Sequence, residues 1–236
     1  MLKAADPFWA AVESYGVNQV FVLTEWVAEK AQDIQQKTPK GVISEMNELR
    51  ESVAGCRKCS LGATRKNIVF GEGNPEAGIL VIGEGPGATE DETGIPFTGR
   101  SGKLLDKIFL SIGLNRKLLF IANIVKCRPP NNRTPSSAEA EICGKFLTRQ
   151  IEIMKPEVIL TLGASAARYI LNTKMGIGAL RGDFHSYGDI PVMVTYHPAA
   201  LLRSPALKRP VWEDMKKLKV FLDKACLPRT TGGGEE

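Results

Sequence analysis

The chain lacks any apolar run that approaches the roughly 18 residues needed to cross a membrane. Its first residues, 1–6, have no apolar segment behind a basic start, so no secretory signal is indicated. We therefore expect a cytoplasmic protein without a membrane partner, whose thiols stay reduced. A chain of 236 residues can bury enough apolar surface to fold without disulfides, which leaves its five cysteines free for chemistry.

Strong charge of one sign is also missing. The net charge of +5 and the isoelectric point of about 8.9 permit binding to nucleic acid but do not require it. Basic residues that could meet phosphates are Arg128, Arg133, Arg203, Lys208, Arg209, Lys216, Lys217 and Lys219. A solvated helix face explains the lysines equally well.

Four short apolar runs, each bounded by turn residues, alternate with helical patterns. The runs span 79–83, 118–123, 158–163 and 191–197, and helices are expected over 102–112, 137–154, 164–171 and 210–225. Strands that are apolar on both faces are typical of parallel sheets covered on both sides. The sequence therefore predicts an α/β fold, a three-layer αβα sandwich around a mostly parallel four-stranded sheet.

The chain divides into three predicted parts. Residues 1–40 are expected to form a helical N-terminal extension that ends in a linker at 38–41, and a helix is expected over 42–53. Residues 41–228 form the main domain. The glycine-rich tail, 229–236, is predicted to be disordered.

Polar or glycine-rich residues follow three of the predicted strands. They are Gly83-Glu84-Gly85-Pro86-Gly87, Asn123 and His197. Ligands of open α/β sheets bind beyond the carboxyl ends of the strands. We expect these residues to converge on one cleft, although Asn123 could instead cap a turn and His197 could be an ordinary surface or core histidine.

The glycine-rich loop does not complete a known nucleotide motif. Position 88 is alanine where a dinucleotide fingerprint has its third glycine, and a P-loop ending is absent. The loop continues into acidic residues that are unfavourable for phosphate. Phe97, held by the preceding Pro96, can present a flat face to a planar heterocycle, or can be a core aromatic.

Four cysteines have a spacing that suits metal ligation. Cys56 and Cys59 form a C-x2-C pair, and Cys127 and Cys143 follow. Four thiolates can hold a 4Fe-4S iron–sulfur cluster or one Zn²⁺, and ordinary buried cysteines are the remaining alternative. Cys226 stands apart and is interpreted as a spare or buried thiol.

In this ordered set of motifs the sequence resembles the family-4, iron–sulfur uracil-DNA glycosylases over about residues 45–225. The matching pieces are Cys56-x2-Cys59, the loop 83–87 with Glu90-Asp91 and Gly94-x-Pro96-Phe97, the stretch 123–130 with Asn132-Arg133 and Cys143, and His197-Pro198-Ala199 with Leu201-Leu202-Arg203. The resemblance favours a 4Fe-4S cluster over zinc, held by the four cysteines.

The resemblance also implies roles for the matching residues. Phe97 would stack on the flipped uracil, Asn123 would bind its Watson–Crick edge, and Glu90 would lie near C5, where thymine carries a methyl group. His197 would donate to O2 as negative charge develops. The loop 198–203 would press into the duplex, with Leu201 or Leu202 replacing the extruded base and Arg203 near phosphate. The two leucines could also pack under the last helix.

The predicted reaction is hydrolysis of the N-glycosidic bond of deoxyuridine in single- or double-stranded DNA by a monofunctional, base-flipping DNA-repair enzyme, expected to be a monomer. Other uracil glycosylases carry a water-activating Asp where this chain has Gly85, so Glu84 or a backbone carbonyl is expected to assist the water. Residues 129–134 contain no histidine, which predicts turnover rather than covalent trapping. Two other classes stay open: a non-catalytic iron–sulfur DNA-binding module and a nucleotide-binding oxidoreductase.

Overall fold

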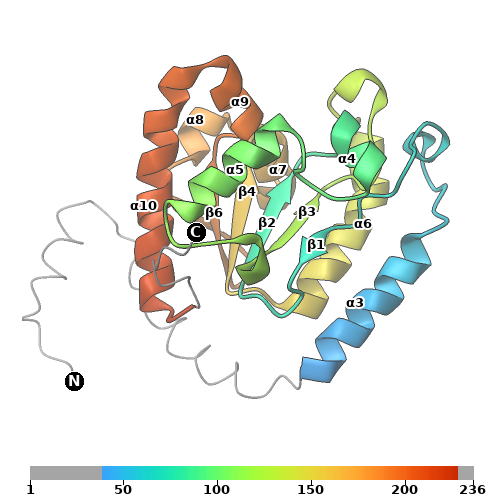
Figure 1. Cartoon of the computed structure of the whole chain (residues 1–236), viewed down its shortest axis with the longest axis horizontal. Helices are drawn as coiled ribbons and strands as arrows, with labels where there is room; N and C mark the ends of the chain where they lie inside the picture. The colour runs from blue at the N-terminus through green and yellow to red at the C-terminus, as the bar shows by residue number, and fades with distance from the viewer. Residues whose placement is uncertain (1–38, 228–236) are drawn as a thin grey trace, which may run out of the picture. The chain divides into compact units, whose positions relative to one another are not determined.

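A computed structural model describes residues 39–227, and its centre is one six-stranded sheet (Figure 1). The strands are β1 (Glu72–Gly73), β2 (Ile79–Gly83), β3 (Phe120–Asn123), β4 (Val158–Leu162), β5 (Phe184–Tyr187) and β6 (Ile190–Thr195). Their order is β1-β3-β2-β4-β6-β5. The four central strands are parallel, as predicted. The two edge strands, β1 and β5, are antiparallel additions that the sequence patterns did not predict.

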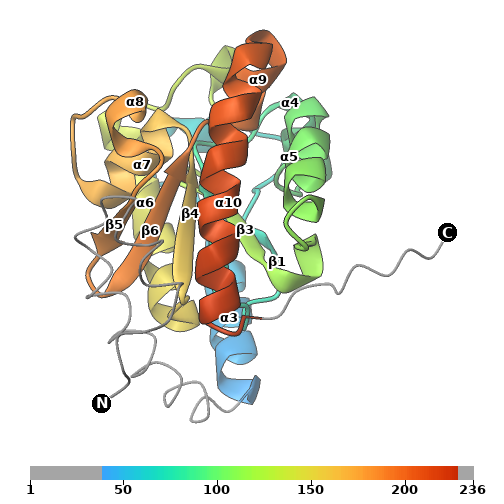
Figure 2. The same cartoon turned by 90° about the vertical axis from the view of Figure 1, so that its left-hand side faces the viewer.

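Helices cover both faces of this sheet. They are α3 (Pro39–Val53), α4 (Ala88–Thr93), α5 (Arg100–Leu110), α6 (Ser137–Met154), α7 (Ala164–Leu171), α8 (Ile177–Leu180), α9 (Pro198–Arg203) and α10 (Lys208–Lys224). Figure 2 shows α5 and α10 on one side of the sheet and α6 and α7 on the other. This arrangement confirms the predicted three-layer sandwich.

Burial explains why the strand sequences are apolar throughout. Every residue of β2, β3 and β4 is buried. Leu80 and Ile82 join the core that contains residues of α3, α6 and α7, while Ile79 and Val81 point to the opposite face. A strand buried on both faces needs apolar side chains at every position rather than at alternate ones.

The predicted helices over 137–154 and 164–171 form with those limits. Ser136 and Glu139 form a capping box at the start of α6, which fixes its first turn. The other two predicted helices begin two residues earlier than expected, at Arg100 and Lys208, and each also ends earlier, at Leu110 and Lys224.

The predicted linker at 38–41 is wrong within the described residues, because α3 already begins at Pro39. Proline suits the first turn of a helix, where its missing N–H has no helical partner to lose. The expected extension over residues 1–40, apart from the first two residues of α3, and the expected tail over residues 229–236 lie outside the described residues. In the described part of the chain, no helix combines the length and apolar character that crossing a membrane requires.

Candidate active site

β2 is the point at which the order of successive strands changes direction in the sheet. The predicted residues come together at this point. β3 pairs with one side of β2 and β4 with the other, so the helices after β2 and β3 leave toward opposite faces. Gly83 at the end of β2 is directly opposite Asn123 at the end of β3. Crevices at such points are the usual ligand sites of α/β sheets. The structure therefore confirms that the strand ends converge.

Gly83 is the position at which these side chains meet. A Cβ atom at Gly83 would lie 2.4 Å from Oδ1 of Asn123 and 2.6 Å from Cζ of Phe97. Neither distance is sterically possible, so only glycine lets the amide and the ring lie against the strand end. The contact places Phe97, predicted from its Pro-Phe pattern and from the family resemblance, beside the predicted Asn123.

The Asn123 amide is buried and incompletely bonded. The residue is 2% exposed. Among the buried side-chain oxygen and nitrogen atoms of residues 39–227, Oδ1 of Asn123 alone has no hydrogen-bond partner. An unsatisfied buried acceptor costs roughly 1–3 kcal/mol, so native structures seldom keep one without a reason. A ligand N–H donor at this position would remove that cost.

Phe97 has an unusual backbone conformation. Its φ of 55° lies in the left-handed region, which is costly for an aromatic residue, by about 1–3 kcal/mol. The ring is buried, and its centroid lies 5.5 Å from that of the His197 ring at an interplanar angle of 31°. Strain of this kind concentrates at functional sites, where surrounding contacts maintain it.

His197 begins α9, and one of its ring nitrogens caps that helix. Nδ1 accepts a hydrogen bond from the backbone N–H of Ala199 at 3.1 Å. In the neutral imidazole the proton is then on Nε2, which makes no hydrogen bond to any described residue. Burial, with a smaller contribution from the positive charge of Arg203, lowers the pKa of His197 to about 4. The ring is therefore a neutral donor at physiological pH.

Glu84 lies one residue beyond β2, with its carboxylate partly bonded. Oε2 accepts a hydrogen bond from Oγ of Ser165, near the start of α7, while Oε1 has no partner among the described residues. At Gly85, a Cβ would lie 2.7 Å from the Val125 side chain. The close approach of Val125 leaves little room for a side chain at position 85.

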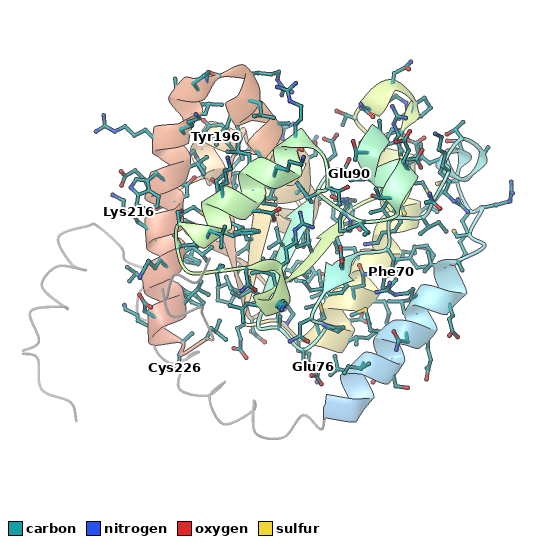
Figure 3. All side chains as sticks on the ribbon, viewed as in Figure 1. Phe70, Glu76, Glu90, Tyr196, Lys216 and Cys226 are labelled. Atoms are coloured by element: carbon teal, nitrogen blue, oxygen red, sulfur yellow. The ribbon has the colours of Figure 1, made fainter. Side chains whose placement is uncertain are left out.

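Glu90 binds the protein's own backbone. Its Oε1 accepts from the amides of Thr98 and Gly99 at 2.9 and 2.8 Å, and Oε2 accepts from Gly87 at 3.1 Å. Figure 3 shows Glu90 at the same end of the sheet as Tyr196, which precedes His197. The carboxylate thus joins the glycine-rich loop to the backbone after Phe97. The role predicted for Glu90 near C5 of a base stays a prediction.

The predicted DNA-contacting residues differ in their exposure. Leu201 is 2% exposed and packs inside, whereas Leu202 is 43% exposed on α9 beside the exposed Arg203. Of the two leucines, only Leu202 faces solvent. Arg133 makes two bonds of 2.8 and 2.7 Å to Glu139, so its guanidinium is already occupied by a carboxylate.

The four predicted ligand cysteines line one small cavity, between the end of α3, the turn around Cys59, the segment after β3 and α6. Cys127 and Cys143 are buried, and burial raises the pKa of both thiols, that of Cys127 to about 11. No set of three or more Cys, His, Asp or Glu in the described chain is arranged around a single metal-ion position. Cys226 is exposed at the end of α10, at the opposite end of the sheet from Glu90 (Figure 3).

Sequence reasoning missed a fully buried lysine next to this cavity. Nζ of Lys126 donates to the backbone oxygen of Asn123 at 2.9 Å and to Oε1 of Gln150 at 2.6 Å. Burial lowers the pKa of Lys126 to about 7. The side chain thereby connects the end of β3 to α6 beside the cysteines. Nothing in the local pattern distinguishes this lysine from a surface one.

Sequence comparisons with known proteins point to one superfamily. The sequence model of the uracil DNA glycosylase superfamily matches residues 70–216. The type-4 uracil-DNA glycosylase of Thermotoga maritima is 45% identical over 76% of this chain and 95% of the relative. That of Saccharolobus solfataricus is 47% identical, over 74% and 85%. A type-5 enzyme of Pyrobaculum aerophilum is 30% identical over only 55% of this chain and 64% of its own length.

The fold is thus that of the uracil DNA glycosylase superfamily, enzymes that hydrolyse N-glycosidic bonds. Within that superfamily, the chain belongs to the type-4 uracil-DNA glycosylases.

Proposed function

We propose that this protein is a monofunctional DNA-repair glycosylase that extrudes deoxyuridine from DNA and hydrolyses its N-glycosidic bond, releasing uracil and leaving an abasic site. The observation that carries the proposal is the unpartnered Asn123 oxygen, buried between the Phe97 ring and the end of β2. The names of three type-4 relatives support the same substrate.

Uracil fits the polarity of the Asn123 amide. The base has an N3–H donor next to its O4 acceptor, and an Asn amide offers an acceptor and a donor in matching order. Oδ1 of Asn123 would accept from N3–H, and Nδ2 would donate to O4. Cytosine has no hydrogen on N3 and would leave Oδ1 unsatisfied. A site built to bond such a group strongly rejects analogues that lack it.

Phe97 and His197 then serve stacking and charge stabilisation. The extruded base loses its stacking in the duplex, and an aromatic ring restores part of that energy. Bond cleavage leaves negative charge on uracil, and a donor already aimed at the oxyanion contributes about 3 kcal/mol. Nε2–H of His197 is such a donor, because the Ala199 amide fixes the tautomer.

Glu84 is the proposed partner of the attacking water. Its free Oε1 can accept a hydrogen bond from water while Ser165 holds Oε2. The departing base leaves a cationic sugar that a weakly activated water can attack, so a strong base is unnecessary. We propose ordinary turnover, with water and not a side chain bonded to C1′ of the sugar.

DNA is proposed to meet α9, with the protein acting as a monomer. Leu202 would enter the space left by the extruded base, and Arg203 would lie near phosphate. Both single-stranded and duplex DNA could present the base, since only the duplex needs Leu202 to fill the gap.

The four cysteines are proposed to hold a structural 4Fe-4S cluster. In a tetrahedral zinc site all four sulfurs lie about 2.3 Å from one ion, whereas each thiolate of a cluster binds a different iron. The four sulfurs share one cavity, and the resemblance to the iron–sulfur family favours the cluster over zinc. The cationic metal core would also compensate for the burial that raises the thiol pKa values. The cluster would join α3, β3 and α6, and the hydrolysis would not involve it.

An oligonucleotide with one uracil, single-stranded or opposite guanine, tests the proposal. The protein is incubated with it in EDTA, and abasic sites are then cleaved with alkali. We expect breakage only at uracil, release of the free base and no protein–DNA adduct. Binding to uracil-DNA without release would instead indicate a non-catalytic module, and a stable adduct would exclude simple hydrolysis.

A further inference from the structure

The backbone around Phe97 is held by a second charged side chain, from a part of the chain that the site motifs do not include. Arg116 belongs to the short 3-10 helix Arg116–Leu118 that precedes β3. Its Nη1 donates to the Pro96 carbonyl at 2.9 Å, and its Nη2 donates to the Phe97 carbonyl. One guanidinium therefore binds two consecutive carbonyl groups at the strained residue.

Arg116 is itself held in place by α5. Its Nε donates to Oδ1 of Asp106 at 2.8 Å, and the Arg116 side chain is 28% exposed. The planar guanidinium can bond an acid on one edge and carbonyls on another, which a lysine cannot do. Asp106 thus fixes the orientation of the guanidinium in which Nη1 and Nη2 reach the carbonyls of residues 96 and 97.

The opposite side of the same backbone segment is bound by Glu90. Arg116 takes the carbonyls of residues 96 and 97, and Glu90 takes the amides of residues 98 and 99. Helix α5 closes the third side, because a Cβ at Gly102 would lie 1.7 Å from the Phe97 oxygen. These contacts define a clamp consisting of Arg116, Asp106, Glu90 and Gly102.

We propose that Arg116, oriented by Asp106, is a positioning residue for uracil recognition: it holds the Phe97 peptide in its left-handed conformation so that the ring lies over the end of β2. This inference rests on the proposed function, in which Phe97 stacks on the base. Among the described residues proposed to bind the base, Arg116 contacts only Phe97. Its effect on excision passes through Phe97 alone.

The test is a double-mutant cycle between Arg116→Gln and Phe97→Ala. Single-turnover excision is measured at saturating protein, the affinity for free uracil by calorimetry, and the melting temperature in parallel. We expect Arg116→Gln to lower the excision rate about tenfold to a hundredfold, the size of effect that misplacing a reacting partner produces. Uracil affinity should fall with it, while affinity for uracil-free DNA stays unchanged.

In the Phe97→Ala background, Arg116→Gln should change the excision rate by less than about twofold, because the coupled partner is gone. Equal factors in both backgrounds would overturn the inference, since a purely structural arginine acts additively. Phe97→Ala with a wild-type rate would overturn it as well and would remove Phe97 from the proposed site.

Two further variants keep the result interpretable. Should Arg116→Gln fail to fold, Arg116→Lys, which can reach one carbonyl but cannot make the whole set, should fold and give an intermediate rate. Arg149→Gln is the matched control, because Arg149 also pairs with carboxylates, Glu45 and Glu152, but lies on α6 away from Phe97. Its excision rate should equal that of the wild type.

The outcomes separate the two proposals. Wild-type protein that binds uracil but excises none would reject the proposed catalysis, and the clamp would then be judged by the same cycle on uracil affinity. Excision by the wild type together with additive losses would reject the clamp only.

Discussion

At the scale of single residues, the proposed chemistry depends on keeping the His197 ring neutral. Protonation would place a positive charge in a buried site near Arg203, so the ring accepts a proton only well below its ordinary pKa of 6.5. The neutral ring keeps its Nε2–H, and the capping bond to Ala199 does not compete for it. A donor of this kind needs no change of protonation during the reaction.

The first prediction concerns this ring. His197→Ala should lower the single-turnover excision rate about a hundredfold to a thousandfold, the size of effect of losing an oxyanion donor. Affinity for uracil-containing DNA, measured by fluorescence anisotropy, should fall much less. Equal losses of rate and affinity would show that the ring binds DNA rather than stabilising developing charge.

The pKa of His197 also sets a pH dependence. Wild-type excision should keep its rate from pH 7 down to about 5 and decline toward pH 4, the region of the lowered pKa. Arg203→Ala removes a charge that lowers this pKa, so the acid limb should move to higher pH. Because the unfolded chain binds the proton first, His197 also makes folding less favourable as pH falls from 6.5 to about 4. A limb at pH 6.5 in the wild type would contradict the buried, neutral ring.

Glu84 is the subject of the second prediction. Glu84→Gln keeps the shape of the side chain but removes the negative charge, and the excision rate should fall roughly a hundredfold if the carboxylate activates water. Ser165→Ala removes only the hydrogen bond to Oε2 and should cost less. An unchanged rate in Glu84→Gln would mean that backbone groups suffice to orient the water.

At the scale of elements, α9 separates two adjacent leucines by their environment. Leu202→Ala should lower excision from duplex DNA more than from single-stranded DNA, since only the duplex leaves a gap to fill. Leu201→Ala should instead destabilise the protein by about 2–5 kcal/mol, as removal of a buried leucine does. Urea unfolding and excision assays on both substrates distinguish the two effects. A reversed pattern would place Leu201 and not Leu202 against DNA.

The elements that could be predicted from sequence are those with strong local patterns. The four parallel strands could be predicted because burial on both faces excludes polar residues and leaves short apolar runs. β1 has only two residues, both exposed, and Gly73 in it has a φ of 116°, so no hydrophobic pattern marks it. β5 is largely half-buried and contains His185 and Ser186. Its pairing with β6 follows from the turn around Gly188 and from tertiary contact.

The site residues that lie at the ends of strands could be predicted from the sequence. Asn123 and His197 follow apolar runs, and parallel strands must bring such ends together. Arg116 gives no such signal, because its partners at 96, 97 and 106 are brought to it only by the packing of α5. The hydrogen bonds of Glu90 could not be predicted from the sequence either, since an acidic residue in a predicted loop usually faces solvent.

For the whole molecule, the cysteine cavity joins segments that are distant in the chain. Cys59→Ser should remove bound iron and sulfide, measured by chemical analysis and visible absorption, and should lower the melting temperature. Each kcal/mol lost corresponds to about 2–4 °C for a domain of this size. Cys226→Ser, remote from the cavity, should change neither. Zinc without sulfide in the wild type would contradict the cluster.

The clamp around Phe97 has a consequence for how damaged bases are found. Because Arg116 and Glu90 bind the Phe97 segment in the absence of DNA, no ordering of this segment is left for the moment of contact. In the proposed reaction, an extruded base would meet a surface that is already formed. On the proposed function, inspection of a base is then brief, because the surface that would meet it needs no rearrangement.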